Sequence, residues 1–282
     1  MATNTINENV DQAILDFGTI KQAIIDKGVE VPEGTPTSQY ATKIGEIQSG
    51  GSSSDDLKGM IERTATEITL PSDCTKIGDY AFYQYSSLTS VDIPESVTSI
   101  EDYAFCQCTN AVINSLPGGL TKVGDHGLSG CHKLVLTSLP ESLTSIKEYA
   151  FSSCTSLALT SLPEGLTSIV STAFSNCTSL ALTSLPSGIT SIGSSAFSSC
   201  TSLALTSLPS GVTSIGSNAF QNCKSLTEIT FEGTPNSIGS TIFYGCTNLT
   251  TIRVPWAEGE VAGSPWGASS ASVIYGYTTE TT

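Results

Sequence analysis

The sequence is poor in ionic and catalytic side chains. Only 13% of its 282 residues are charged, and histidine, methionine and tryptophan occur twice each. Apart from Lys224, residues 165–227 contain no charged side chain. The central part of the chain is therefore expected to present a neutral Ser/Thr surface, with solubility supplied by the acidic ends.

Positive charge is also scarce, which excludes one class of partner. The chain carries 11 Lys and Arg against 26 Asp and Glu, a formal net charge of −15. Because capture of a phosphate backbone needs a basic surface, nucleic acid is not expected as a partner.

Long apolar runs are absent as well. No stretch approaches the roughly 18 apolar residues of a membrane helix, and residues 1–17 lack a basic start followed by an apolar run. The sequence thus predicts neither a membrane span nor a Sec export signal, and we expect the chain to fold in a cytoplasm.

Catalytic motifs are missing too. The two histidines, His126 and His132, lie near Asp125 and Ser129, a set that could suggest nucleophilic catalysis. No Gly-x-Ser-x-Gly elbow, metal-binding helix or phosphate-binding loop accompanies them. We therefore interpret both histidines as exposed residues of an irregular repeat, and expect no enzyme.

Four acidic residues are candidates for metal binding. The alternative is that they form a surface that faces water. The oxygen ligands that calcium prefers could come from four acids, but acids this scattered more commonly face water. They are Asp92, Glu95, Glu101 and Asp102. No metal and no cofactor is expected.

What the sequence does contain is a 23-residue repeat. Residues 150–218 hold three near-identical units, AFSSCTSLALTSLPEGLTSIVST, AFSNCTSLALTSLPSGITSIGSS and AFSSCTSLALTSLPSGVTSIGSN. The register extends to eight apolar pairs, at Ala81-Phe82, Ala104-Phe105, Gly127-Leu128, Ala150-Phe151, Ala173-Phe174, Ala196-Phe197, Ala219-Phe220 and Ile242-Phe243. Self-similarity at a fixed period predicts a solenoid of eight turns.

Apolar residues within one unit follow neither helical nor strand spacing. They lie at Ala173, Phe174, Cys177, Leu180, Leu185, Ile189 and Ile192. This pattern fits a coil that turns several corners around a core, so that each apolar side chain stacks on its equivalent one turn away. At roughly 4.8 Å per turn, eight turns form a rod about 40 Å long.

The unit resembles a leucine-rich repeat of the Treponema and Bacteroides surface-antigen type, called BspA-like. The resemblance covers about residues 64–254 and rests on Leu88-Thr-Ser-Val91-Asp-Ile93-Pro94, Val97-Thr-Ser-Ile100 and Ala104-Phe105. It implies a solenoid made mainly of β-strands with irregular or short helical return segments. Such repeats are binding scaffolds, and their fold names no ligand.

A small helical module is predicted ahead of the solenoid, in residues 1–48. Apolar residues recur there at spacings of three and four, which predicts one amphipathic helix closed by Gly28 and a second short helix after Ser38. Residues 49–56 then form a Gly/Ser linker. The run Ile20 to Ile44 resembles an N-terminal module of bacteriophage tail and structural proteins, which implies a segment that docks to a virion or trimerises.

The solenoid is expected over residues 57–254, with a C-terminal cap over residues 255–282. Both tryptophans, Trp256 and Trp266, lie in this last segment. They could form an aromatic sugar-binding patch, or they could shield the end of the core from water. The ending Val-Pro-Trp…Ser-Pro-Trp-Gly-Ala also resembles the closing segment of repeat-bearing phage tail proteins.

Cysteine recurs at the same place in seven successive turns. Buried free thiols, disulfides and a metal site are three readings of this column. Stacked turns hold equivalent side chains farther apart than the roughly 3.8 Å between the Cβ atoms of a disulfide, and a metal needs ligands that converge on one point. We favour buried thiols at Cys108, Cys131, Cys154, Cys177, Cys200, Cys223 and Cys246.

The middle turns reverse the family pattern at the strand. The third strand position is polar at Ser90 and the fourth apolar at Val91, whereas the middle turns carry an apolar residue first and a polar one second. If the register holds, five side chains form an exposed apolar column and a candidate contact surface; the alternative is a local bulge that turns them inward. They are Ile113, Leu136, Leu159, Leu182 and Leu205.

The leading functional hypothesis is a non-enzymatic bacteriophage virion structural protein. Its N-terminal helices would contact other virion proteins, and its solenoid would bind a host surface protein or glycan. The alternative is a bacterial surface adhesin or antigen of the BspA-like family.

Overall fold

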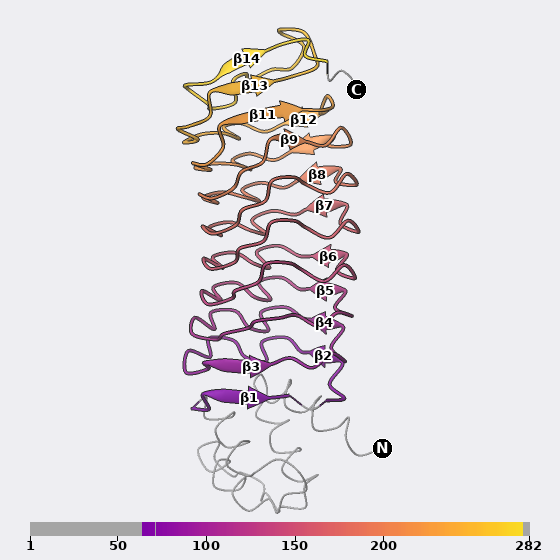
Figure 1. Ribbon diagram of the computed structural model, residues 1–282, viewed down its shortest axis with the longest axis vertical. Coiled ribbons are helices and arrows are strands. Elements are labelled where there is room, and N and C mark those ends of the chain that lie inside the picture. Colours follow the sequence, from indigo (N-terminus) through magenta and orange to yellow (C-terminus); the bar gives the residue numbers. More distant parts are fainter. Residues whose placement is uncertain (1–63, 71, 279–282) are drawn as a thin grey trace, which may run out of the picture.

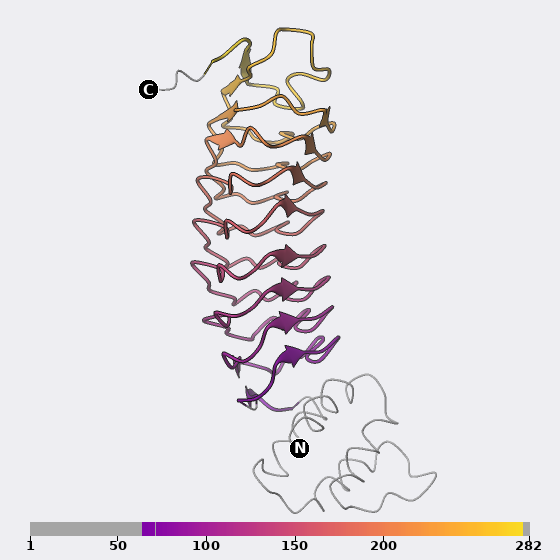
Figure 2. The ribbon, with the colours of Figure 1, turned by 90° about the vertical axis from the view of Figure 1, so that its right-hand side faces the viewer.

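The computed structural model describes residues 64–70 and 72–278, which coil into a solenoid whose turns stack along one axis (Figures 1 and 2). All strand pairing is parallel, as expected for equivalent positions of successive turns. The predicted leucine-rich solenoid is confirmed. The predicted N-terminal helices and the Gly/Ser linker lie outside the described residues.

Of the two forms predicted for the return segments, irregular or short helical, the described residues show the irregular one and contain no helix. The return segments are turns that contain two residues of positive φ each, such as Tyr103 at 57° and Gln107 at 63°. A left-handed residue every few positions interrupts any right-handed helix, so the chain turns a corner at each. With no helix there, the described residues also offer none that could cross a membrane.

One ladder of strands is complete only at the two ends of the solenoid. Between β3 and β9 it shrinks to the isolated bridges Ser90 to Val112 and Ile113 to Leu134. At the N-terminal end β1 pairs with β3, and at the C-terminal end the order is β14-β13-β11-β9. The strands are β1 (Glu67–Thr69), β3 (Ser90–Asp92), β9 (Ser207–Leu208), β11 (Glu228–Phe231), β13 (Thr251–Arg253) and β14 (Ser272–Ile274).

The second ladder follows another side of the solenoid and is divided into two sheets, β2-β4-β5-β6 and β7-β8-β10-β12. Each strand carries one isoleucine or valine on its inner side, which is buried in every strand but β12, where Ile238 is half-buried. No pairing joins β6 to β7. The strands are β2 (Lys76–Ile77), β4 (Ser99–Ile100), β5 (Lys122–Val123), β6 (Ser145–Ile146), β7 (Ser168–Ile169), β8 (Ser191–Ile192), β10 (Ser214–Ile215) and β12 (Ser237–Ile238).

The division between β6 and β7 coincides with Val170. The residue after each of these strands donates its N–H to the preceding turn, as Lys147 does to Val123 O at 3.0 Å, yet no such bond joins Val170 to Ile146. A Cβ placed at Gly193, at the equivalent position of the next turn, would clash with the backbone of the turn before it. Glu101 and Lys147 also carry a Cβ at this position and keep the bond. Val170 is the one β-branched residue there, and its turn is the one that lacks the bond.

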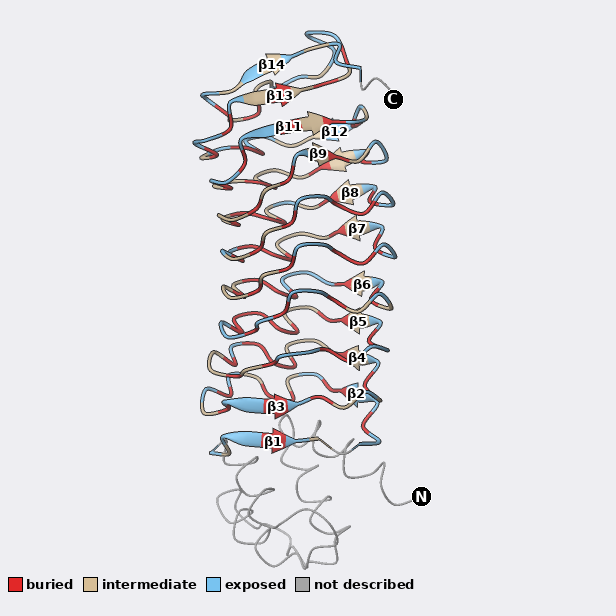
Figure 3. Cartoon of the chain, viewed as in Figure 1, coloured by how far each residue is buried: buried red, intermediate tan, exposed pale blue. Residues whose placement is uncertain are grey.

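The core consists of columns that run along the solenoid axis, and buried residues line its interior (Figure 3). All eight predicted apolar pairs are buried, which confirms the 23-residue register. The rings of Phe151, Phe174, Phe197, Phe220 and Phe243 stack at centroid distances of 5.4–5.7 Å. Because each ring contacts only the turns beside it, the stability of the solenoid is the sum of neighbouring contacts.

The C-terminal end of the core is covered by both indoles. Trp256 and Trp266 are 3% and 2% exposed and pack with Phe231 at ring-centroid distances of 5.3 and 5.7 Å. Burial places both tryptophans in the core, so they do not form a sugar-binding patch. β14 pairs with β13 over this end and continues the ladder by one strand.

Candidate functional site

The proposed leucine column is not on the surface. Ile113, Leu136, Leu159, Leu182 and Leu205 are all at most 3% exposed. The exposed contact stripe predicted from the strand register is therefore wrong, and the alternative of inward-facing side chains is what the structure shows.

The reason is a local change of backbone that the middle turns share. Thr160 and Thr183 point outward while Leu159 and Leu182 point inward, and no strand forms at these positions, although β7 and β8 form elsewhere in the same turns. At the leucine position one backbone bond joins each turn to the one before it, such as Ala181 N to Leu159 O at 3.0 Å. Burial of a leucine contributes about 1.5–3 kcal/mol, more than the roughly 0.5–1.5 kcal/mol of a backbone hydrogen bond, so the strand is lost and the leucine is buried.

The cysteine column is buried, as predicted, and has a further role in the backbone. Each of its seven thiols donates to a carbonyl oxygen 26 residues earlier, for example Cys177 Sγ to Phe151 O at 3.0 Å. All nine cysteines, all within the described residues, are free and buried. Burial raises the pKa of Cys177 to about 12. A thiol held neutral in this way is a structural group with low reactivity.

An aromatic stack runs along the outside of turns one to four. Tyr80, Tyr103, His126 and Tyr149 occupy the same position of the 23-residue repeat, and their rings stack at centroid distances of 4.7, 4.5 and 4.4 Å with interplanar angles of 4–12°. The ring of Tyr83 packs edge-on against the side of the stack. We call the four stacked rings the aromatic stack.

The fold does not require rings at this position. Turns five to eight carry small polar residues there, at Thr172, Ser195, Asn218 and Thr241, with the same positive φ of 55–60°. Since the backbone conformation does not require an aromatic residue here, the rings can serve a role other than folding.

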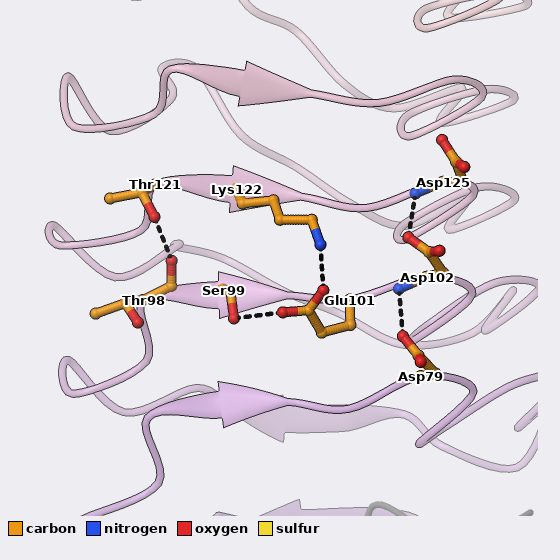
Figure 4. Close-up of polar contacts among 8 residues, drawn as sticks. All are labelled: Asp79, Thr98, Ser99, Glu101, Asp102, Thr121, Lys122 and Asp125. Atoms are coloured by element: carbon orange, nitrogen blue, oxygen red, sulfur yellow. Dashed lines mark hydrogen bonds and ion pairs between the residues drawn. The ribbon is translucent and has the colours of Figure 1, made fainter.

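A column of carboxylates occupies the position just before the aromatic stack in each of these turns, and Figure 4 shows three of its members, Asp79, Asp102 and Asp125. Asp79 accepts a hydrogen bond from the backbone N–H of Asp102 at 3.0 Å, Asp102 from that of Asp125 at 2.8 Å, and Asp125 from that of Glu148 at 3.0 Å. One oxygen of each of these carboxylates thus forms a hydrogen bond to the backbone of the next turn. From turn five onward serine replaces the acid, beginning at Ser171.

One ion pair stabilises the same edge. Lys122 Nζ contacts Glu101 Oε2, and Ser99 Oγ donates to Glu101 Oε1 at 2.8 Å (Figure 4). Burial alone would raise the pKa of Glu101, but the hydrogen bonds from Lys122 and Ser99 outweigh it and lower the pKa. Both groups are therefore charged at neutral pH, and each is paired with the other.

His126 lies in the aromatic stack, so its interpretation as an exposed residue of an irregular repeat is wrong. Burial between two rings lowers the pKa of His126, although Asp125, Asp102 and Glu148 act in the opposite direction. The imidazole is accordingly neutral at pH 7 and packs as an aromatic ring. His132 is exposed, as predicted.

This edge combines aromatic rings, carboxylates and hydroxyls. The described residues contain no group of three or more His, Cys, Asp or Glu side chains that could hold a metal ion. Of the four acids considered for calcium, Glu101 pairs with Lys122, while Glu95 and Asp102 accept backbone N–H bonds. Aromatic rings, carboxylates and hydroxyls at fixed spacing can stack on a ligand and hydrogen-bond to it.

Comparison with known proteins identifies the class. The model of the BspA type leucine rich repeat region matches six copies over residues 62–158 and 154–259, so the chain belongs to this family. The residues that carried the sequence resemblance lie within the match. No curated protein sequence matches the chain.

Several solved structures are similar to this chain. A leucine-rich repeat protein from Bacteroides ovatus is similar at 25% identity with a TM-score of 0.54, over 75% of this chain and 61% of that protein. The chain therefore spans about three fifths of the Bacteroides protein. A leucine rich repeat protein from T. pallidum matches at 31% identity and a TM-score of 0.45, over 67% and 79% of the two chains. A leucine rich cell surface protein from Faecalibacterium prausnitzii matches at 25% identity and a TM-score of 0.44, over 68% and 76%.

Proposed function

We propose that this chain is a non-enzymatic binding protein of a bacterial cell surface, an adhesin or antigen of the BspA type. The solenoid acts as a rigid rod that presents one edge to its ligand. The family membership supports this role, since the surface-antigen type is the one that the repeat resembles.

The observation that carries the proposal is the asymmetry of the solenoid. Turns one to four combine the aromatic stack with the carboxylate column, while turns five to eight carry only small polar residues at the same positions. The core columns of the two halves are alike, so the difference is confined to the surface. A surface that changes while the core does not is the pattern expected of a binding scaffold.

The test is localisation on intact cells of the source bacterium. An antibody raised against residues 64–278 should label unpermeabilised cells, and proteinase K added outside the cells should abolish the signal. A chain that is detected only after lysis would overturn the proposal. A cytoplasmic marker protein in the same cells controls for leakage.

The role of a phage structural protein stays a prediction that rests on residues 20–44 and on the ending around Trp256 and Trp266. Mass spectrometry of purified phage particles tests it. Stoichiometric presence in particles, without labelling of cells that carry no induced prophage, would replace the surface assignment with the virion one.

A further inference from the structure

The aromatic stack ends with one ring face open. Tyr149 is covered on one face by His126, at a ring-centroid distance of 4.4 Å, but turn five places Thr172 on the other side. A threonine side chain is too small to cover a phenol ring. Accordingly Tyr149 is 38% exposed, whereas the other three members of the stack are half-buried.

The turns also stand farther apart at this point. The backbone N–H of Tyr149 lies 3.4 Å from Ser171 O, whereas the equivalent N–H to O distances at Tyr80, Tyr103 and His126 are 2.8–2.9 Å. Here, too, β6 and β7 are unpaired, beside Val170. The open ring face therefore borders the one interruption of the second ladder.

The residues beyond the ring are neutral and rich in hydroxyls. Ser171, Thr172 and Ser194 follow Tyr149 along the surface, and we call these three the hydroxyl step. No charged side chain occurs between residue 164 and Lys224. The charges beside Tyr149 are those of Lys147, Glu148 and Asp125, whose carboxylate accepts a bond from the Glu148 N–H at 3.0 Å, so an anionic ligand meets no net positive charge there.

We propose that the open face of Tyr149 and the hydroxyl step bind a neutral saccharide ring. A sugar ring has a face of C–H groups that packs on an aromatic ring, and a rim of hydroxyls that hydrogen-bond to serine and threonine. It would take the place that a fifth ring of the stack would occupy. This inference rests on the proposed binding function and names its ligand class.

An apolar ligand fits this place less well. It could stack on Tyr149, but it would leave the hydroxyls of Ser171 and Thr172 without water or a partner. A saccharide satisfies both, because each of its hydroxyls donates and accepts. Specificity then depends on the hydroxyls, since the ring face is shared by many sugars.

The test uses the full chain on an array of neutral oligosaccharides that end in glucose, galactose, N-acetylglucosamine or N-acetylgalactosamine, with sialylated and sulfated glycans beside them. The best-retained free sugar is then titrated by saturation-transfer difference NMR. Three variants are compared: Tyr149→Thr, Thr172→Val and the matched control Tyr80→Thr, which makes the same change at the far end of the stack. Threonine already occupies this position in turn five, so the fold is preserved.

Wild-type chain should bind a neutral saccharide, and Tyr149→Thr should lose at least about tenfold in affinity. Thr172→Val should lose about threefold or more, because it removes one hydroxyl and keeps the shape. Tyr80→Thr should bind as wild type does. Retention of no glycan, retention of anionic glycans alone, or unchanged binding by Tyr149→Thr would overturn the saccharide site. None of these results bears on whether the chain is displayed on cells, which the labelling experiment decides separately.

Discussion

Phe174 lies inside the stacked phenylalanine column, with a ring on each side, and its removal should divide the unfolding of the solenoid into two steps. The side chain is fully buried and stacks on Phe151 at 5.4 Å and on Phe197 at 5.7 Å. Truncation of a buried phenylalanine costs about 3–5 kcal/mol. Because the rings on both sides lose their partner, we expect Phe174→Ala to lie at the upper end of this range, at about 4–5 kcal/mol.

That loss is of the order of the whole stability of a typical domain, about 5–15 kcal/mol. It falls on the contacts between turns, which are what couples one half of a solenoid to the other. Phe174→Ala should therefore separate the stabilities of the two halves, whereas the wild type should unfold as one unit.

The two tryptophans make the separation measurable. Trp256 and Trp266 report only on the C-terminal end, whereas far-ultraviolet circular dichroism reports on all turns. In urea the two signals should coincide for the wild type and diverge for Phe174→Ala. Coincident transitions, with a loss below about 1 kcal/mol, would refute the reasoning.

Leucine offers a matched control at the same position. Leu128 occupies this place in turn three and is fully buried there. Phe174→Leu keeps most of the volume, so it should lose less than about 1.5 kcal/mol. Its fluorescence and dichroism transitions should stay coincident.

Three further predictions concern other parts of the solenoid. Burial raises the pKa of Cys177 to about 12, so this thiol should not react with a chromogenic disulfide at pH 8 until the chain is unfolded; fast labelling of folded protein would contradict its burial. The pKa of Glu101 is lowered in the fold from 4.5, so its contribution to stability is present above pH 4.5 and lost as the pH falls through the folded value; Glu101→Gln should be less stable than wild type at pH 7 and equal to it in acid, as thermal melts would show. The amide of Val170 lacks the bond that Gly193 N makes to Ile169 O at 2.7 Å, so hydrogen exchange should be faster at Val170 than at Gly193; equal protection would mean that β6 and β7 pair in solution.

The sequence was sufficient for the register of the core. Columns such as Phe151, Phe174 and Phe197 recur at one fixed period, and only a solenoid buries all of them at once. The cysteine column followed from the same argument, although its bonds to carbonyl oxygens depend on the shape of each corner and could not be read from spacing.

The direction of the leucine column could not be derived in the same way. Leu159 and Thr160 are an apolar residue followed by a polar one, the reverse of Ser90 and Val91 in an earlier turn. The family pattern alone favours keeping the strand. Backbone bonds and side-chain burial compete at this place. Which of the two wins depends on the free energies of leucine burial and of the backbone hydrogen bonds. Several adjacent turns also change their backbone together.

The aromatic stack was missed although its members lie at one position of the repeat. When each turn is read alone, the dipeptides Asp-Tyr, Asp-Tyr, Asp-His and Glu-Tyr do not look alike. His126 also lies near Ser129, which makes the two look like a candidate catalytic pair. Alignment of the turns at period 23 places Tyr80, Tyr103, His126 and Tyr149 in one column. The missing bond beside Val170 depends on the backbone geometry of that turn, for which the sequence has no comparable signal.

The uniform period also bears on how such a chain can change its length. Residues 150–218 are three nearly identical units, so unequal recombination within their coding sequence would add or delete 23 residues at a time. Each event would preserve the 23-residue register of every buried column, and it would lengthen or shorten the rod by roughly 4.8 Å. The indole-covered end would move relative to Tyr149 while both kept their own neighbours. The reach of the rod can thus vary between lineages without any change in what its two ends contact.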